Sequence, residues 1–445
     1  MARKVLITFL GTNDYIPSNY YFGNKKIENT KFIQEAVIRI FCDEWNEGDK
    51  VFIFLTKDAE RINWEDNEFK NQEGNKVLKE GLRKKLLLLK DEGFKVDIQA
   101  IKNIPDGLVE DDIWKIFDVV FNQLEKEDEV IFDITHGFRS IPMLAFALLN
   151  YAKFAKEIKI KGIYYGAFEV LGPAYNVKQM PQEQRNAPIV DLTSFSTLED
   201  WTTGIHDFIN LGTAKKMLEL TNSQLIPVIK QKNEISELAK KIRIFAITLE
   251  EMTNIISTVR GQEIIKGDVF MKIKNDLKEI KKINFITPLQ MILILIEKKV
   301  EKYDKNQILN GFIAVEFCIE HELIQQGITL LQEMILTFLI TKYDEKQINN
   351  IDLRNAFSSA LSIIENNIDE TKWKGNKELL KTLIELSYIK QFSPIYSRIG
   401  RHRNSINHAG FTNNISAKDF KIVLKEEYEK VMKIISSFDD IDKVQ

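Results

Sequence analysis

The sequence has few of the features that would place it outside a reducing, aqueous compartment. Only two cysteines, Cys42 and Cys318, occur in 445 residues, too few for a disulfide framework or a cysteine-rich zinc site. The apolar run Met291–Ile296 is only six residues long, whereas a membrane-spanning helix needs about 20. The N-terminal run Val5–Leu10 is likewise too short for a secretory signal. We therefore expect a soluble, cytoplasmic protein with no membrane partner.

An excess of charge of one sign is also absent. The 62 Lys and Arg residues nearly balance 65 Asp and Glu, which gives a formal net charge of −3. This balance excludes a uniformly basic nucleic-acid coat, although it is compatible with a local basic site. Hydrophobic residues make up 44% and charged residues 29% of the chain, the balance of a folded protein. Because 445 residues exceed one ordinary core, we expect two or three domains.

Strand-like segments are concentrated in the first part of the chain, where six of the nine prolines precede residue 190. Four short apolar runs, bounded by polar or turn residues, have the pattern of strands buried on both faces. These runs are Val5–Leu10, Val51–Leu55, Val96–Ile101 and Val130–Ile134. Helical patterns separate them, and Ile160–Tyr165 adds a fifth strand. The alternation predicts a doubly wound, Rossmann-like parallel sheet, followed by a loop or irregular hairpin at Leu171–Pro188.

After about residue 195 the pattern changes to long amphipathic helices. The predicted helices cover Ile235–Val259, a segment opening with Thr287-Pro288, Phe312–Gln325, Thr329–Lys342, Leu379–Lys390 and Lys418–Phe438. The predicted fold class is therefore α/β plus all-α. We expect an α/β domain at residues 1–195, a helical connector at 196–300 and a helical domain at 301–445.

Two loops of the α/β domain carry polar residues and glycine at the ends of strands. The first strand ends in Gly11–Asp14 (GTND), and the fourth in Thr135–Ser140 (THGFRS). In an open parallel sheet, ligands bind outside the carboxyl ends of the strands, where the strand order switches. Glycine allows close backbone approach, hydroxyl groups form hydrogen bonds, and Arg139 presents a planar cation near a helix start. This content suits a nucleotide or phosphate ligand.

A purely structural interpretation of these loops competes with the functional one. Gly137 would then make a turn, and His136 would bond a neighbouring carbonyl. The sequence contains neither a P-loop lysine nor a complete G-x-G-x-x-G fingerprint, which disfavours ordinary ATP or NAD binding.

A basic cluster near the C-terminus has the composition of a catalytic site. Three of the twelve arginines and two of the five histidines fall within residues 398–408. RNA cleavage by the neighbouring 2′-hydroxyl needs a proton-exchanging group near neutral pH and a cation against the phosphorane charge; Arg403 and His408 are groups of these types. Two residues five positions apart on an ideal helix, such as Arg403 and His408, point in directions that differ by about 140°. A site shared by two copies of the chain is therefore physically sensible. Because the spacing alone is weak, a solvated basic turn is the competing interpretation.

Together these segments resemble the CARF–HEPN ribonucleases of type III CRISPR systems. The CARF resemblance covers residues 1 to about 190, through FLGTND at Phe9–Asp14 and DITHGFRSIP at Asp133–Pro142. The HEPN resemblance covers roughly residue 300 onward, through RNSINH at Arg403–His408 and the stretch Cys318–Gly327. The connector carries no part of the resemblance, and its role stays unassigned.

The resemblance implies a homodimer, or a higher even oligomer, whose CARF domains bind a cyclic oligoadenylate, with a leaning towards cyclic tetra-adenylate. Binding then activates metal-independent cleavage of single-stranded RNA in antiviral defence. The implied contacts to the cyclic ligand are Gly11, Thr12, Asn13, Thr135, His136, Gly137, Arg139 and Ser140. Arg403 and His408 match the catalytic pair, with Asn404 in the polar position after the arginine. We expect Arg398 and Arg401 to line the RNA groove.

Two other functions stay open. The connector could read DNA and make the protein a ligand-controlled transcription regulator, although residues 196–300 contain no compact basic recognition helix that we can identify. Alternatively, the CARF loops could themselves cut the cyclic ligand and act as a ring nuclease.

Overall fold

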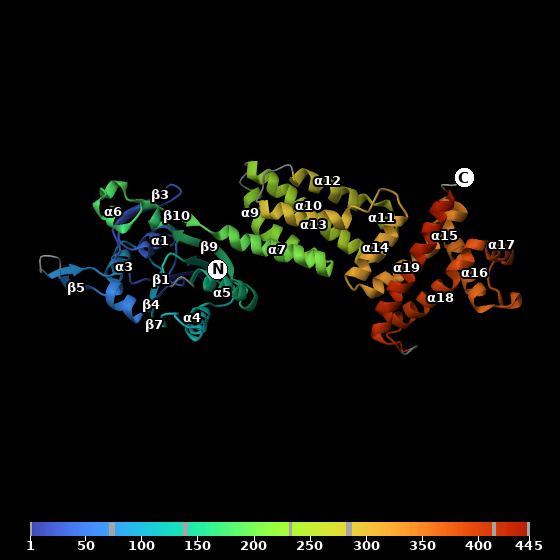
Figure 1. Cartoon of the computed structure of the whole chain (residues 1–445), viewed down its shortest axis with the longest axis horizontal. Coiled ribbons are helices and arrows are strands. Elements are labelled where there is room, and N and C mark those ends of the chain that lie inside the picture. The colour runs from blue at the N-terminus through green and yellow to red at the C-terminus, as the bar shows by residue number, and fades with distance from the viewer. Residues whose placement is uncertain are drawn as a thin grey trace. The chain divides into compact units, whose positions relative to one another are not determined.

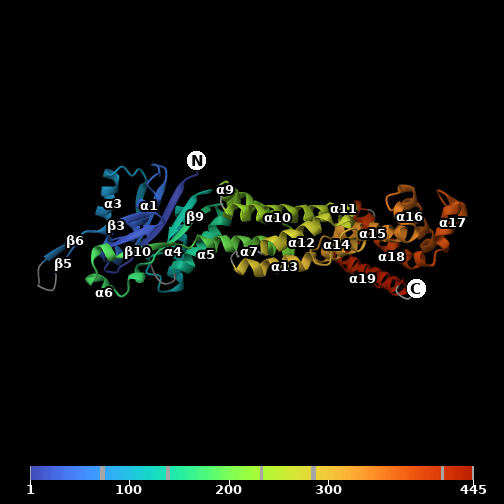
Figure 2. The same cartoon turned by 90° about the horizontal axis from the view of Figure 1, so that it is seen from above.

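The computed structural model describes residues 2–70, 76–136, 141–230, 234–281, 287–411 and 415–442. These residues belong to two compact units, Met1–Glu199 and Asp200–Gln445 (Figures 1 and 2). The first unit mixes strands and helices, and the second is helical throughout its described part. The predicted fold class, α/β plus all-α, is therefore confirmed. The predicted division of the helical part at residue 300 stays a prediction.

In the described residues, the main sheet of the first unit has eight strands in the order β3-β2-β10-β9-β8-β1-β4-β7. Five neighbouring strands run parallel to one another, with β7 at the edge of the sheet, and they confirm the five predicted from apolar runs. They are β1 (Lys4–Leu10), β4 (Lys50–Thr56), β7 (Asp97–Ile104), β8 (Glu129–Asp133) and β9 (Lys159–Gly166). The chain fills the sheet outward from β1, first towards β4 and β7, then towards β8 and β9. The strand order therefore switches between β1 and β8, where the two candidate loops begin.

Both faces of this sheet are covered by helices, which explains the continuous apolar runs in its strands. On β1, Leu6 packs into one core and Val5 and Ile7 into the other. The first core includes residues of α1 (Ile33–Phe41) and α3 (Leu82–Asp91). The second core includes residues of α4 and α5 (Figure 1), which span Glu110–Gln123 and Ile141–Ala155.

The sheet edge beyond β9 differs from the prediction. The predicted loop at Leu171–Pro188 instead contains a short helix, α6 (Ala174–Gln179), and the start of β10 (Asn186–Asp191). β10 runs antiparallel to β9 and parallel to β2 (Ser18–Phe22), which pairs with β3 (Lys25–Thr30). A separate antiparallel hairpin consists of β5 (Asn67–Lys70) and β6 (Lys76–Lys79). A helical turn, α2 (Lys57–Ala59), and a π-helical turn at Glu60–Trp64 precede that hairpin.

The second unit is built from helices. The helix that enters it, α7, spans Thr193–Leu211. The following helices are α8 (Lys215–Leu220), α9 (Ile226–Ile229), α10 (Glu234–Ser257), α11 (Gly261–Lys266), α12 (Asp268–Lys281), α13 (Thr287–Val300), α14 (Leu309–Glu320), α15 (Ile324–Asp344), α16 (Ile351–Asn366), α17 (Lys377–Glu385), α18 (Ser387–Asn407) and α19 (Ala417–Asp442). α10 and α12 pack side by side (Figure 2), and α15 packs against α14, α16, α18 and α19.

The structure divides two of the predicted helices in this unit. The segment Phe312–Gln325 is broken after Glu320, where Glu322 adopts a positive φ of 57° before α15 begins. The segment Leu379–Lys390 is divided at Leu386, which has extended backbone angles and separates α17 from α18. Among the residues described, no helix combines the length and apolar character needed to cross a bilayer.

Candidate functional site

The loop that follows β1 is held by two side chains that the sequence analysis did not single out. The Gly11 N–H donates to the Tyr15 hydroxyl at 2.9 Å. The Nδ2 of Asn63, in the π-helical turn, donates to the carbonyl oxygens of Gly11 and Asn13, both at 2.9 Å. A Cβ at position 11 would lie 2.7 Å from the Tyr15 hydroxyl, so the loop needs glycine there. The side chains of Thr12 and Asn13 are exposed.

The end of β8 is fixed by a buried carboxylate. Asp133 is fully buried and accepts hydrogen bonds from Thr8 Oγ1 at 2.7 Å and from the Thr135 N–H at 3.0 Å. Burial raises the Asp133 pKa above its ordinary value, although these bonds oppose the shift. The Thr135 hydroxyl donates to Asp133 and accepts from the Gly166 N–H at 2.7 Å. Thr135, predicted to contact the ligand, therefore ties the ends of β8 and β9 together.

His136 lies beside the first loop. Its ring centroid is 4.5 Å from that of Tyr15, and its Cβ would lie 3.7 Å from a Cβ at Gly11. Burial lowers the pKa of His136 to about 4, so the imidazole is neutral at pH 7 and carries both a donor and an acceptor nitrogen. The described parts of the two predicted loops therefore meet. Gly137, Arg139 and Ser140, which were also predicted to bind the ligand, lie outside the described residues.

Lysines from distant segments surround the end of the first loop. The Asp14 carboxylate pairs with Lys79 Nζ at 3.3 Å and with Lys178 Nζ at 3.2 Å. Burial and the charge of Lys79 both lower the pKa of Lys31. The sequence analysis missed these cations because Lys79 lies on β6 and Lys178 on α6, far from the loop along the chain.

In the second unit, Arg403 of α18 is held by α15. Its Nη1 donates to Gln332 Oε1 at 3.1 Å and to Glu333 Oε1 at 3.2 Å. The other carboxylate oxygen of Glu333 accepts from Arg354 Nη2 on α16 at 2.7 Å. One carboxylate therefore lies between two guanidinium groups, which leaves a net positive charge in this triad.

His408 follows directly after α18. Its N–H donates to the Asn404 carbonyl at 3.0 Å, and the side chains of His408 and Asn404 are exposed. Ala409 and Gly410 then adopt positive φ angles of 51° and 78°, which ends the helix. The structure thus places the predicted catalytic residues Arg403, Asn404 and His408 within the last turn of α18 and its C-terminal cap.

The two arginines predicted to bind RNA have different surroundings. Arg398 Nη1 donates to Glu427 Oε1 at 2.6 Å and pairs with Glu426 at 3.2 Å, both on α19. Arg401 is exposed and forms no ion pair with any described residue. Arg398 therefore fastens α18 to α19, whereas Arg401 is free to contact a ligand.

Two cavities meet at Arg403. One, of 800 Å³, is lined by residues of α11, α15, α16 and α18, among them Glu333, Arg354 and Tyr396. The other, of 270 Å³, is lined by Asn407 and by residues of α15 and of the end of α10. Across the portion of the chain that is described, no three His, Cys, Asp or Glu side chains are grouped as metal ligands.

Residues 5–169 match the family model described as the CARF domain of CRISPR system endoribonuclease Csx1. A CRISPR-associated protein of Methanocaldococcus jannaschii is 31% identical over 189 residues. That match covers 41% of this chain and 27% of the relative, so the chain spans about a quarter of the relative's length. The family match lies within the first unit and includes both loops that carry the resemblance.

A solved structure of Enterococcus italicus Csm6 bound to cyclic hexa-2′-fluoro-hexa-dAMP is also similar to this chain. The similarity has a TM-score of 0.47 and 14% sequence identity, and it covers 98% of this chain and 94% of that one.

Proposed function

We propose that this protein is a ligand-gated endoribonuclease. The premise is that residues 5–169 form a CARF domain and that the chain is a type III CRISPR ancillary protein. In this proposal the first unit binds a cyclic oligoadenylate, and binding activates RNA cleavage by a HEPN-type site in the second unit. The single observation that carries the proposal is the position of Arg403, at the junction of two cavities and five residues before His408.

The ligand would bind at the carboxyl ends of β1 and β8. The exposed Thr12 and Asn13 would contact it, and Lys79 and Lys178 would supply positive charge to its phosphates. Asp14 now pairs with both lysines, so a phosphate would compete with this carboxylate. A ring of repeated nucleotides has rotational symmetry, which favours a site shared by two copies of the chain about a two-fold axis.

RNA cleavage would proceed by attack of a 2′-oxygen on the adjacent phosphorus. The 2′-hydroxyl proton leaves as the new P–O2′ bond forms, and the P–O5′ bond breaks as the leaving oxygen takes a proton. His408 would take the first proton or supply the second, and the Arg403 guanidinium would stabilise the phosphorane. The products would carry 2′,3′-cyclic phosphate and 5′-hydroxyl ends, and the cycle would need no metal ion.

Glu333 would set the position of the Arg403 guanidinium. The carboxylate accepts one hydrogen bond from Arg403 and one from Arg354, and a charge-assisted bond of this kind orients the planar group. Because two guanidinium groups share one carboxylate, the wall of the larger cavity that these residues line keeps a net positive charge, which suits a phosphodiester.

The test uses the full-length protein, end-labelled single-stranded RNA, and cyclic tetra-adenylate or cyclic hexa-adenylate, all in EDTA. We expect cleavage only with a cyclic ligand, and a loss of at least about 100-fold in rate for Arg403→Ala and for His408→Ala. Arg61→Ala and His206→Ala change exposed residues of the same types and serve as matched controls. Unchanged cleavage in both active-site variants, or no cleavage with any ring size, would rule the proposal out.

A further inference from the structure

The smaller cavity beside Arg403 is polar on several sides. It has a volume of 270 Å³ and lies between the end of α10, the first turns of α15 and the last turn of α18. Six residues that line it are Thr258, Gln325, Gln326, Thr329, Arg403 and Asn407. The volume is large enough for one nucleobase with part of its ribose.

The side chains around this cavity are available for recognition. Within the described structure, Gln325, Gln326 and Asn407 form no side-chain hydrogen bond, and neither does the hydroxyl of Thr329. A carboxamide carries both a donor and an acceptor, as does a hydroxyl group, so these groups can match the polar edge of a base. Arg403 is the charged side chain that lines this cavity.

We propose that this cavity is a nucleobase subsite, which reads the identity of one nucleotide next to the phosphate bound by Arg403. The inference rests on the proposed ribonuclease function and adds a specificity determinant to it. An unpaired base of single-stranded RNA presents its hydrogen-bonding edge to a protein. Gln325, Gln326 and Asn407 would bond that edge, and Thr329 the base or the ribose.

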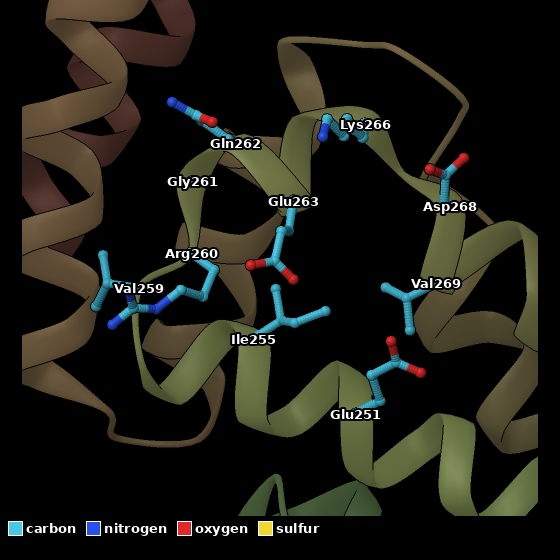
Figure 3. A pocket seen from close by; sticks show the side chains of 10 residues that line it. All are labelled: Glu251, Ile255, Val259, Arg260, Gly261, Gln262, Glu263, Lys266, Asp268 and Val269. Carbon is cyan, nitrogen blue, oxygen red and sulfur yellow. The ribbon is translucent and has the colours of Figure 1, made fainter. Parts of the chain in front are cut away.

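The wall supplied by α10 has an unusual backbone. Val259 adopts a positive φ of 57°, a conformation that β-branched residues avoid. The Val259 N–H donates to the Ile256 carbonyl at 3.0 Å and the Arg260 N–H to the Ile255 carbonyl at 2.9 Å, so the turn closes the helix end. Figure 3 shows the Val259–Gly261 turn beside a third cavity, of 730 Å³, and Val259 lines all three cavities. The predicted connector thus supplies one wall of the subsite.

The experiment measures cleavage preference with an RNA library randomised around one position. Wild type, Gln325→Ala, Gln326→Ala, Thr329→Val and the exposed control Gln307→Ala are activated with the same cyclic ligand, and products are sequenced. Loss of one hydrogen bond to a base changes a preference by about tenfold. We expect at least one of the three subsite variants to lose the wild-type preference at one position, while Gln307→Ala keeps it.

A second measurement follows binding of short homopolymeric RNAs to the same proteins, each also carrying His408→Ala. If wild type cleaves RNA and all three variants keep its nucleotide preference, the subsite is overturned and the ribonuclease function is not. Absence of wild-type cleavage would overturn the ribonuclease function. In that case, equal affinities of wild type and variants for every homopolymer would also overturn the subsite.

Discussion

Val259 shows how a single backbone conformation affects the second unit. It is a valine with a φ of 57°, whereas the end of α16 places Asn367 in the same left-handed region, with a φ of 47°. An L-residue with a Cβ branch pays about 1–2 kcal/mol for this conformation, and asparagine tolerates it better. The two helix ends therefore form a natural pair for comparison.

We expect Val259→Asn to raise the free energy of unfolding of the second unit by about 1 kcal/mol. Asn367→Val should lower it by a similar amount, because it creates the same backbone strain at the other helix end. Calorimetric unfolding of the full-length variants measures both changes. A destabilising effect of Val259→Asn would show that the packing of the valine side chain outweighs its backbone strain.

His136 predicts a pH dependence of the first unit. Its pKa falls from an ordinary value of 6.5 to about 4 in the folded protein, so the unfolded chain binds more protons between these two values. Stability from this residue is fully present above pH 6.5 and is lost as the pH falls towards 4. The loss is at most about 3 kcal/mol.

The measurement compares thermal unfolding at pH 7, 6, 5 and 4 for wild type and His136→Gln. We expect a flatter profile in the variant, and the wild-type profile in the exposed control His206→Gln. Parallel profiles for wild type and His136→Gln would show that the imidazole is not the group responsible.

At the scale of elements, the candidate ligand site combines a loop, a hairpin and a short helix. Lys79 of β6 and Lys178 of α6 reach the same carboxylate, Asp14, after β1. We expect Lys79→Ala and Lys178→Ala each to weaken binding of a cyclic oligoadenylate about three- to tenfold at low salt. Asp14→Asn should strengthen binding, because the competing anion is removed.

Equilibrium binding at two salt concentrations tests this prediction. The control is Lys161→Ala, because Lys161 pairs with Glu129 at the amino end of β8, away from the site. Lys79→Ala and Lys178→Ala should each also make the affinity depend less on salt concentration. Equal affinities for all four variants would show that these lysines do not contact the phosphates.

The strands that the sequence predicts most clearly are those whose two faces are both buried against apolar side chains. The strands β1, β4 and β8 are buried on both faces, so their apolar runs identify them directly. The edge strand β3 reads KKIENT and is mostly exposed, so no apolar pattern marks it. β10 begins within a proline-containing segment and gains its partners from β9 and β2, which local sequence cannot reveal.

The candidate sites divide in the same way. The loops after β1 and β8 were predictable, because glycine and polar residues directly follow recognisable strands. Glu333 was not, because it lies 70 residues from Arg403 along the chain, in a helix that is otherwise largely buried. Asn63 was missed for the same reason, since its two hydrogen bonds to the Gly11 loop arise from the tertiary fold.

For the molecule as a whole, the proposed activation implies that ligand binding and RNA binding affect each other reciprocally. If the cyclic ligand raises RNA affinity by some factor, RNA must raise ligand affinity by the same factor, typically about 5- to 150-fold. Titration of His408→Ala protein with each partner, in the absence and presence of the other, measures both factors. Factors of one in both directions would show that ligand binding does not change RNA affinity, and activation would then have to act on catalysis alone.

The two cysteines offer a practical route to observing such a change. Cys42 and Cys318 are unpaired and completely buried, one in each unit, and burial raises the pKa of Cys318 to about 12 and that of Cys42 above its ordinary value. Both thiols should therefore resist maleimide reagents while the chain is folded. Cysteines introduced on the surface could carry a fluorophore pair with little background labelling, which would allow energy-transfer recordings of single molecules as the activator arrives and leaves.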